Sequence, residues 1–193
     1  MNEENVPARN ERMFRAVEFA AMAHRGQYRK GTAVPYIVHP LGAARTLIEL
    51  GCEEDVVIAA LLHDVVEDTK FTLEDIKKEF GERVAFIVEG CTEPHHNNEP
   101  WEVRKKHTIE FLKTAPVDVL LVACADKLDN IRSTKIDLQN RGEVTWLKFH
   151  KGKVEQQWYY TELAKIFIKR SEGSVHSVLF QQLKDEVDCV FKR

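Results

Sequence analysis

The sequence predicts an all-α protein, and three observations carry this prediction. Apolar residues recur with the period of about 3.6 residues typical of helices along almost the whole chain. The β-branched residues lie inside these helical patterns, so no strand-like run stands out. Glycine, proline and polar clusters separate the apolar segments, with no repeat and no linker that would divide two domains. We therefore expect one domain over residues 1–193, with roughly eight to ten helices packed ridge into groove.

The N-terminal half of the sequence predicts five helices. Glycine and proline break the pattern over residues 25–36, and Gly51 ends the second helix. The third segment is rich in apolar residues and should be a buried helix. Thr72-Leu73-Glu74-Asp75 resembles a capping box, with Asp in place of the usual Glu, and opens the fourth helix. The expected ranges are about 11–24, 39–50, 53–68, 73–81 and 83–92.

The C-terminal half predicts four more helices. A polar loop over residues 94–100 precedes the first of them, and Pro116 suits the first turn of the second. A polar break at Asn140-Arg141-Gly142 precedes a long third helix. Ser174 is a candidate N-cap for the last helix. The expected ranges are about 101–113, 117–133, 146–169 and 174–192.

Composition places the chain among ordinary soluble globular proteins. Of its 193 residues, 44% are hydrophobic and 31% are charged, and the net charge is −3. So small a charge gives no bulk attraction to nucleic acid or to an anionic membrane. No apolar run approaches the roughly 20 residues of a membrane span, and the polar N-terminus is no signal peptide. The four cysteines form no Cys-x-x-Cys pair and fit small buried hydrophobes in a reducing cytosol. We expect a cytoplasmic protein.

The residues that carry chemistry begin with the adjacent pair His63 and Asp64. Neighbours on a helix point about 100° apart, so this pair can bind one cation only with further ligands from elsewhere. His39 and Asp126 are polar residues in apolar surroundings, where a buried carboxylate is costly unless it is paired or bound to metal. These four residues are candidate metal ligands. The alternatives are a surface His-Asp pair and a helix cap at His39.

Two acidic residues follow the pair by one helical turn. Glu67 lies four residues after His63, and Asp68 lies four after Asp64, so each shares a helix face with its partner. Acids at a helix C-terminus oppose the macrodipole, which suggests that they serve a purpose. They could reach a water near the metal without binding the metal. The alternative is that both acids lie at the helix end without a functional role.

Two basic segments are candidates for substrate binding. The segment Arg29-Lys30-Gly31-Thr32 forms a loop that could present a guanidinium plane to an aromatic base and an ammonium to phosphate. The alternative for this loop is a solvated charge pair. The run Arg104-Lys105-Lys106 is a weaker candidate, because on a helix it equally describes a solvent-facing side.

Three motifs occur in order along the chain: Arg29-Lys30-Gly31-Thr32-x-x-Pro35-Tyr36-x-x-His39-Pro40, Leu61-Leu62-His63-Asp64-Val65-Val66-Glu67-Asp68-Thr69, and Ala125-Asp126-Lys127-Leu128-x-Asn130-x-Arg132. Together they resemble the hydrolase domain of the Rel/Spo alarmone enzymes, which are HD-domain phosphohydrolases. No synthetase or regulatory segment follows, so the chain resembles the stand-alone small alarmone hydrolases. The resemblance implies an HD-type helical bundle, with a motif core over about 14–133 and C-terminal helices over about 146–192.

The resemblance also implies roles for these residues. His39, His63, Asp64 and Asp126 would bind a single Mn²⁺, although Fe, Co or Zn could enter the same ligand set. Glu67 and Asp68 would position and activate the attacking water. The residues that the resemblance implies for substrate binding are Arg29, Lys30, Asn130 and Ser133. Thr32 of the same basic loop and Arg104 of the weaker basic run are further candidates. The reaction would remove pyrophosphate from the 3′ position of ppGpp or pppGpp, the alarmones of the stringent response, so the implied partner is a small nucleotide.

The sequence departs from the family at Asp129, where the alarmone hydrolases usually carry His or Tyr. A carboxylate beside a polyphosphate is unfavourable unless it faces away. Residues 146–160 match only loosely, and their Trp and Tyr side chains are interpreted as core packing. Two alternatives stay open: an HD phosphohydrolase of dNTPs or nucleoside monophosphates, and a catalytically silent nucleotide-binding module. Glu67 and Asp68 argue against the silent module, which would not need them.

Overall fold

The structure, a computed structural model, describes residues 11–93, 99–171 and 175–192. Within these residues it contains α-helices, one 3-10 helix and no strand, which confirms the all-α prediction. The elements are α1 (Glu11–Ala23), α2 (Val38–Glu49), α3 (Glu54–Leu62), α4 (Val65–Asp68), α5 (Leu73–Phe80), α6 (Glu82–Cys91), α7 (Trp101–Leu112), α8 (Val117–Arg141), η2 (Gly142–Lys148), α9 (Lys153–Arg170) and α10 (Ser177–Phe191).

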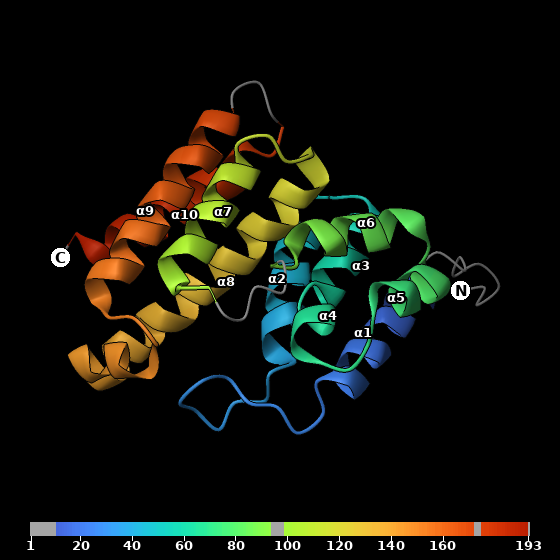
Figure 1. The fold of residues 1–193 in the computed structure, drawn as a ribbon, viewed down its shortest axis with the longest axis horizontal. Coiled ribbons are helices and arrows are strands. Elements are labelled where there is room, and N and C mark those ends of the chain that lie inside the picture. The colour runs from blue at the N-terminus through green and yellow to red at the C-terminus, as the bar shows by residue number, and fades with distance from the viewer. Residues whose placement is uncertain (1–10, 94–98, 172–174, 193) are drawn as a thin grey trace, which may run out of the picture.

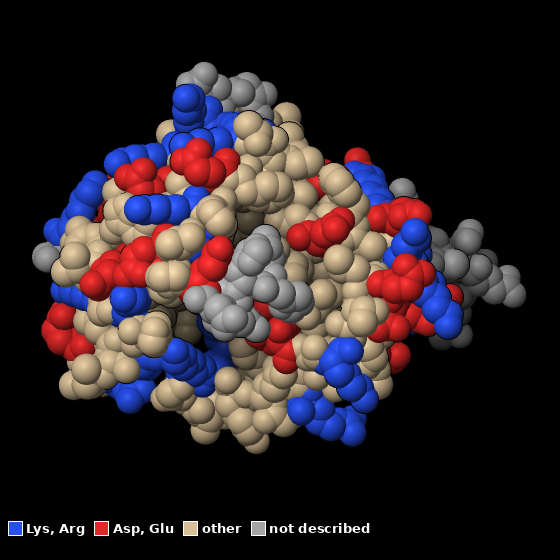
Figure 2. All heavy atoms as spheres, viewed as in Figure 1, with Lys and Arg blue, Asp and Glu red and all other residues tan. Residues whose placement is uncertain are grey.

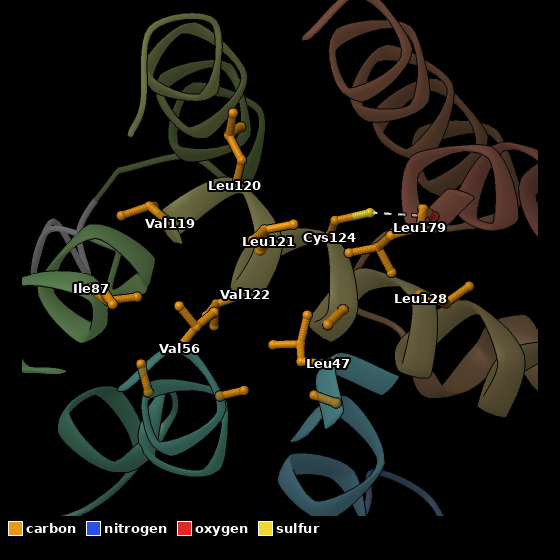
Figure 3. Packing of buried hydrophobic residues seen from close by; sticks show 14 of the residues in the cluster. Leu47, Val56, Ile87, Val119, Leu120, Leu121, Val122, Cys124, Leu128 and Leu179 are labelled. Carbon is orange, nitrogen blue, oxygen red and sulfur yellow. Dashed lines mark hydrogen bonds between the residues drawn. The ribbon is translucent and has the colours of Figure 1, made fainter. Parts of the chain in front are cut away.

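The long helix α8 holds the bundle together. It packs against α2, α3 and α6 on one side and against α10 and η2 on the other (Figure 1). Around it the buried apolar side chains form a continuous core, in which Leu47 of α2 points toward α8 and Val56 of α3 lies near Val122 of α8 (Figure 3). This arrangement places the start of α2, the end of α3 and the middle of α8 next to one another.

Several helix ends match their sequence signals. The Thr72 hydroxyl accepts a hydrogen bond from the Asp75 amide at 3.3 Å, and the Asp75 carboxylate accepts one from the Thr72 amide at 2.8 Å. This reciprocal pair is a capping box, which satisfies two amides that a helix N-terminus leaves free. Gly51 follows α2 with φ +70°, a conformation that favours glycine. The predicted polar loop lies mostly, and Ser174 wholly, outside the described residues.

The single helix predicted over 53–68 is wrong. The structure ends α3 at Leu62 and begins α4 at Val65, and the pair between them forms a turn. Asp64, with φ −94° and ψ −5°, stays within the right-handed helical region and caps the start of α4. In a continuous helix Asp64 would point about 100° away from His63. The break instead brings its Oδ2 to 3.1 Å from His63 Nε2.

Two predicted boundaries in the C-terminal half are also wrong. The helix expected to end near Ser133 continues to Arg141, because its polar side chains find partners on other elements; Lys135, for example, lies 2.7 Å from a carboxylate oxygen of Glu186 on α10. The helix expected from residue 146 begins at Lys153, because residues 142–148 form η2 instead. Within η2 Trp146 is buried and stacks on Phe191, with ring centroids 5.4 Å apart.

None of the described helices is both long and apolar enough to cross a bilayer. Acidic and basic side chains are interspersed over the face drawn in Figure 2. Within the described residues none of the four cysteines forms a disulfide, and Cys124 is buried in the core. That residues 1–193 form one domain stays a prediction.

Candidate metal centre

The candidate site lies where α2, the turn between α3 and α4, and α8 meet. His39 comes from the first turn of α2, His63 from the turn, and Asp126 from the middle of α8. Each offers one metal-ligating atom, and these atoms all lie within 4.8 Å of one another. The three side chains belong to residues with only 1%, 3% and 8% of their surface exposed. Core packing on three elements therefore fixes the cluster.

The fourth predicted ligand, Asp64, faces the same point. Its Oδ2 lies 3.1 Å from His63 Nε2 and 3.4 Å from His39 Nε2. Asp126 Oδ1 lies 3.2 Å and 3.8 Å from the Nε2 atoms of His39 and His63. The structure thus brings together all four residues that the sequence indicated, and their role as ligands stays a prediction.

The outer sides of the two imidazoles fit a metal site. His63 Nδ1 donates to the carbonyl oxygen of Ala60 at 2.8 Å, and His39 Nδ1 donates to Asp129 Oδ2 at 2.6 Å. Histidine ligands typically donate their second ring N–H to a carbonyl or a carboxylate in this way. His63 Nε2 is buried and has no hydrogen-bond partner among the described residues. Imidazole nitrogens and carboxylate oxygens pointing inward suit a divalent cation.

The two inner carboxylates are held by hydrogen-bond donors. Asp126 accepts from Lys127 Nζ at 2.6 Å and from Asn130 Nδ2 at 2.5 Å. Tyr36 donates its hydroxyl to Asp64 Oδ2 at 2.6 Å. These donors offset part of the free energy that burying two charged carboxylates costs. They also fix the directions of the oxygen atoms.

The cluster is strongly coupled electrostatically. Burial favours the neutral form of Asp64, but the imidazoles of His63 and His39 outweigh it and hold the pKa of Asp64 well below its usual range. Burial opposes protonation of His39, but hydrogen bonds to Asp126, Asp129 and Asp64 raise its pKa to about 9. Without a cation these carboxylates therefore favour the protonated form of His39. A cation that binds to this imidazole must displace its proton.

The acidic pair Glu67 and Asp68 lies in α4, directly after this centre. Glu67 accepts a hydrogen bond from the Glu93 amide at 3.3 Å. Partial burial and the charges of Glu93 and Asp64 raise the pKa of Glu67, despite this hydrogen bond. Partial burial and the charge of Asp64 likewise raise the pKa of Asp68. A carboxyl group with a raised pKa is a better proton acceptor in catalysis near neutral pH.

A chain of hydrogen bonds links the basic loop to the centre. Arg29 donates to Asn130 Oδ1 at 2.7 Å, and Asn130 in turn donates to Asp126. The Arg29 guanidinium also lies 5.7 Å from the centroid of the Tyr36 ring. Two residues predicted to bind substrate are therefore bonded to each other beside a candidate ligand.

The other residues predicted to bind substrate are connected less directly to the candidate metal centre. Thr32 donates to the carbonyl oxygen of Arg29 at 2.9 Å and so closes the basic loop. Lys30 is exposed, and Ser133 lies half-buried on α8. Arg104 is half-buried and pairs with Glu93 at 2.7 Å, so the solvent-facing alternative does not describe it. Through Glu93, Arg104 is connected to Glu67.

Three residues that contact the candidate ligands have no role that the sequence alone assigns. Tyr36 lies within the first motif, Lys127 adjoins a candidate ligand, and Asp129 stands out in the sequence only as a departure from the family. The carboxylate of Asp129 faces His39, which explains how it can be tolerated here. Its spacing of three residues from Asp126 on one helix was the available signal.

Comparisons with known proteins show which proteins this chain is similar to. Residues 16–147 match the family described as "HD domain". The guanosine-3′,5′-bis(diphosphate) 3′-pyrophosphohydrolase MESH1 of Mus musculus is 42% identical over 183 residues, which is 93% of this chain and 93% of the relative. The protein of Aquifex aeolicus named guanosine-3′,5′-bis(diphosphate) 3′-pyrophosphohydrolase is 44% identical over 130 residues, 67% of this chain. The aligned region spans only 18% of that longer relative.

A solved structure supports the same assignment of the fold. It is described as a metazoan ortholog of SpoT that hydrolyses ppGpp and plays a role in starvation responses. It superposes with a TM-score of 0.75 at 29% identity, covering 96% of this chain and 97% of that one. The similarity therefore includes the C-terminal helices beyond the three motifs.

Proposed function

This chain belongs to the HD-domain family, and from that premise we propose that it hydrolyses guanosine 3′,5′-bis(diphosphate), ppGpp, to GDP and pyrophosphate. The observation that carries the proposal is the convergence of His39, His63, Asp64 and Asp126 on one buried point. The similarity to MESH1 over nearly the whole chain supports the substrate. We expect the protein to act in the cytoplasm on this small nucleotide.

The proposed cofactor is one Mn²⁺ held by His39, His63, Asp64 and Asp126. Two nitrogen donors and two carboxylates suit Mn²⁺, and Fe, Co or Zn could occupy the same donors. A divalent cation at such a site polarises phosphoryl oxygens and lowers the pKa of water, so that hydroxide is available near neutral pH.

The chain's own acids would handle the proton. Glu67 and Asp68 follow the ligands on the short helix α4, and both have a raised pKa. We propose that they orient the attacking water and accept its proton. A positioned acid or base of this kind contributes about 10²–10⁴-fold to a rate.

The basic loop would bind the nucleotide. Arg29 is held beside the centre by Asn130, and its guanidinium plane could stack on guanine while Lys30 contacts phosphate. Asn130 would meet the ribose, and Thr32, Ser133 and Arg104 would complete the substrate-binding set. Stacking at Arg29 is the interaction that would distinguish a nucleotide from a simple phosphate ester.

A substrate panel tests this proposal. Purified protein loaded with Mn²⁺ is incubated with ppGpp, pppGpp, dNTPs and nucleoside monophosphates, and kcat/KM is measured for each. We expect ppGpp or pppGpp to give the highest value. His63→Ala should remove the activity, whereas His150→Ala, an exposed histidine outside the cluster, should retain it.

Each of the other outcomes of the substrate panel would overturn a defined part of the proposed function. Turnover of dNTPs with no turnover of ppGpp would overturn the alarmone assignment and leave an HD phosphohydrolase of other nucleotides. Absence of metal-dependent turnover with every substrate would overturn the enzymatic proposal and favour a nucleotide-binding module.

A further inference from the structure

A carboxylate lies behind one of the candidate ligands, on the side away from the proposed metal. Asp129 is one helical turn beyond Asp126 on α8, and its Oδ2 accepts the Nδ1–H of His39 at 2.6 Å. His39 is almost fully buried, with 1% of its surface exposed. The imidazole is thus held on one side by Asp129, while its Nε2 faces Asp64 and Asp126.

The opposing helix is shaped to admit this carboxylate. Gly42 of α2 faces Asp129, and a Cβ at position 42 would lie 2.2 Å from Asp129 Oδ1 and 3.0 Å from its Cγ. No alanine could occupy this position without displacing the carboxylate. Glycine weakens a helix interior relative to alanine, so its presence in the middle of α2 requires a reason. Room for Asp129 provides that reason.

The two candidate histidine ligands differ in this respect. His63 donates its Nδ1–H to a neutral backbone carbonyl, that of Ala60, whereas His39 donates to a charged side chain. A charge-assisted hydrogen bond is stronger, and a carboxylate partner makes the ligand nitrogen more basic. Substitution of Asp129 on α8 should therefore affect the imidazole of His39 and leave that of His63 unchanged.

We propose that Asp129 is a positioning residue for the metal centre: its carboxylate keeps the proton on Nδ1 of His39 and directs Nε2 toward the cation. The inference rests on the metal site of the proposed function and on no assumption about the nucleotide. It also assigns a purpose to a carboxylate that would otherwise be unfavourable beside a polyphosphate. Gly42 contributes to this contact between Asp129 and His39, because it leaves the space that Asp129 occupies.

Calorimetric titration with Mn²⁺ tests the proposal without a substrate. We expect Asp129→Asn, which keeps an acceptor but loses the charge, to weaken Mn²⁺ binding about 10–100-fold, and Asp129→Ala to weaken it at least as much. The matched control is Asp137→Asn, the same change on the same helix, where the carboxylate pairs with Lys148 instead. This control should bind Mn²⁺ as the unmodified protein does.

A double-mutant cycle separates positioning from general damage. Gly42→Ala should weaken Mn²⁺ binding when Asp129 is present, because the added methyl group displaces the carboxylate. In the Asp129→Ala background the same change should have little further effect. An equal loss of affinity from Gly42→Ala in both backgrounds would overturn the proposal.

Nitrogen-15 NMR of the histidine rings provides a readout in metal-free protein. We expect the ring nitrogens of His39 to shift in Asp129→Ala while those of His63 stay unchanged. A purely structural role for Asp129 predicts a lower melting temperature with unchanged Mn²⁺ affinity and unchanged His39 signals, and this result would overturn the inference. Failure to hydrolyse ppGpp would not affect it, whereas absence of Mn²⁺ binding in the unmodified protein would overturn the metal site and this inference together.

Discussion

Tyr36 donates its hydroxyl to Asp64 Oδ2 over 2.6 Å, so the loop between α1 and α2 is bonded directly to the candidate metal centre. The same loop carries Arg29, whose guanidinium lies 5.7 Å from the Tyr36 ring. Tyr36 thus contacts a proposed metal ligand at its hydroxyl and lies beside a proposed substrate residue at its ring. Binding of metal and binding of nucleotide should therefore be coupled through this side chain.

Tyr36→Phe removes only the hydroxyl and tests this contact. Loss of a hydrogen bond to a ligating carboxylate typically lowers metal affinity about 10–100-fold, and we expect a loss in this range. Calorimetric titration with Mn²⁺ measures it. Tyr28→Phe is the matched control, because Tyr28 lies in the same loop and is 59% exposed. Equal Mn²⁺ affinity in the two variants would contradict the predicted role of Tyr36.

Asp64→Ala and Glu67→Ala should separate metal binding from proton transfer. Asp64 Oδ2 lies 3.1 Å from His63 Nε2, so removal of the Asp64 carboxylate should abolish both Mn²⁺ binding and turnover. Glu67 lies outside the cluster, so Glu67→Ala should keep the metal and lose about 10²–10⁴-fold in kcat. Elemental analysis and ppGpp kinetics measure the two effects. Stoichiometric metal in the Asp64 variant, or near-normal turnover in the Glu67 variant, would refute the assigned roles.

Arg29→Ala should weaken nucleotide binding and leave the metal in place. Stacking of a guanidinium on a base contributes about 0.5–2 kcal/mol, so KM for ppGpp should rise by up to about thirtyfold. A simple phosphate ester, which has no base, should be hydrolysed almost as before. Arg25→Ala, which changes an exposed arginine of the preceding turn, is the control. Unchanged ppGpp kinetics in Arg29→Ala would exclude base recognition by this loop.

Metal binding should strengthen as pH rises. Burial disfavours the protonated form of His39, but hydrogen bonds to Asp126, Asp129 and Asp64 raise its pKa from 6.5 to about 9. A cation must displace this proton, so Mn²⁺ affinity should rise between about pH 6.5 and about pH 8.5, by about tenfold per pH unit for each proton released. Titration calorimetry in buffers of different ionisation enthalpy measures both the affinity and the protons released.

The metal-free protein should show the opposite trend. The contribution of protonated His39 to stability is fully present below its unfolded pKa and is lost as pH rises through about 9. The melting temperature of the metal-free protein should therefore fall as pH rises over this window. The increase in melting temperature on adding Mn²⁺ should become larger over the same window. A Mn²⁺ affinity that is flat or falls with pH would show that His39 is not protonated in the free site.

Local patterns in the sequence predicted most of the fold. The capping box at Thr72 and the glycine after α2 are signals that neighbouring residues carry alone, and both appear as expected. The break between α3 and α4 has no such local signal. It accompanies an Asp64 side chain that faces His39, a residue on another helix, and local periodicity contains no information about such a contact.

In the candidate site, too, local motifs indicate some features, whereas others depend on how the helices pack. Its four inward-facing residues were recognisable from their motifs, because each motif is short and the order of the three is specific. The contact between His39 and Asp129 joins residues 90 positions apart in sequence and depends on how α2 packs against α8. The sequence showed that Asp129 was unusual, and only the fold showed which side chain it faces.

The products of ppGpp hydrolysis test the proposed activity most directly. Protein stripped of metal and reloaded with Mn²⁺ is incubated with ppGpp, and the nucleotides and phosphates are separated by anion-exchange chromatography over time. We expect GDP and pyrophosphate in equal amounts, with no turnover before Mn²⁺ is restored and none in His63→Ala. Intact ppGpp after prolonged incubation with Mn²⁺-loaded protein, or release of phosphate from the 5′ position instead, would contradict it.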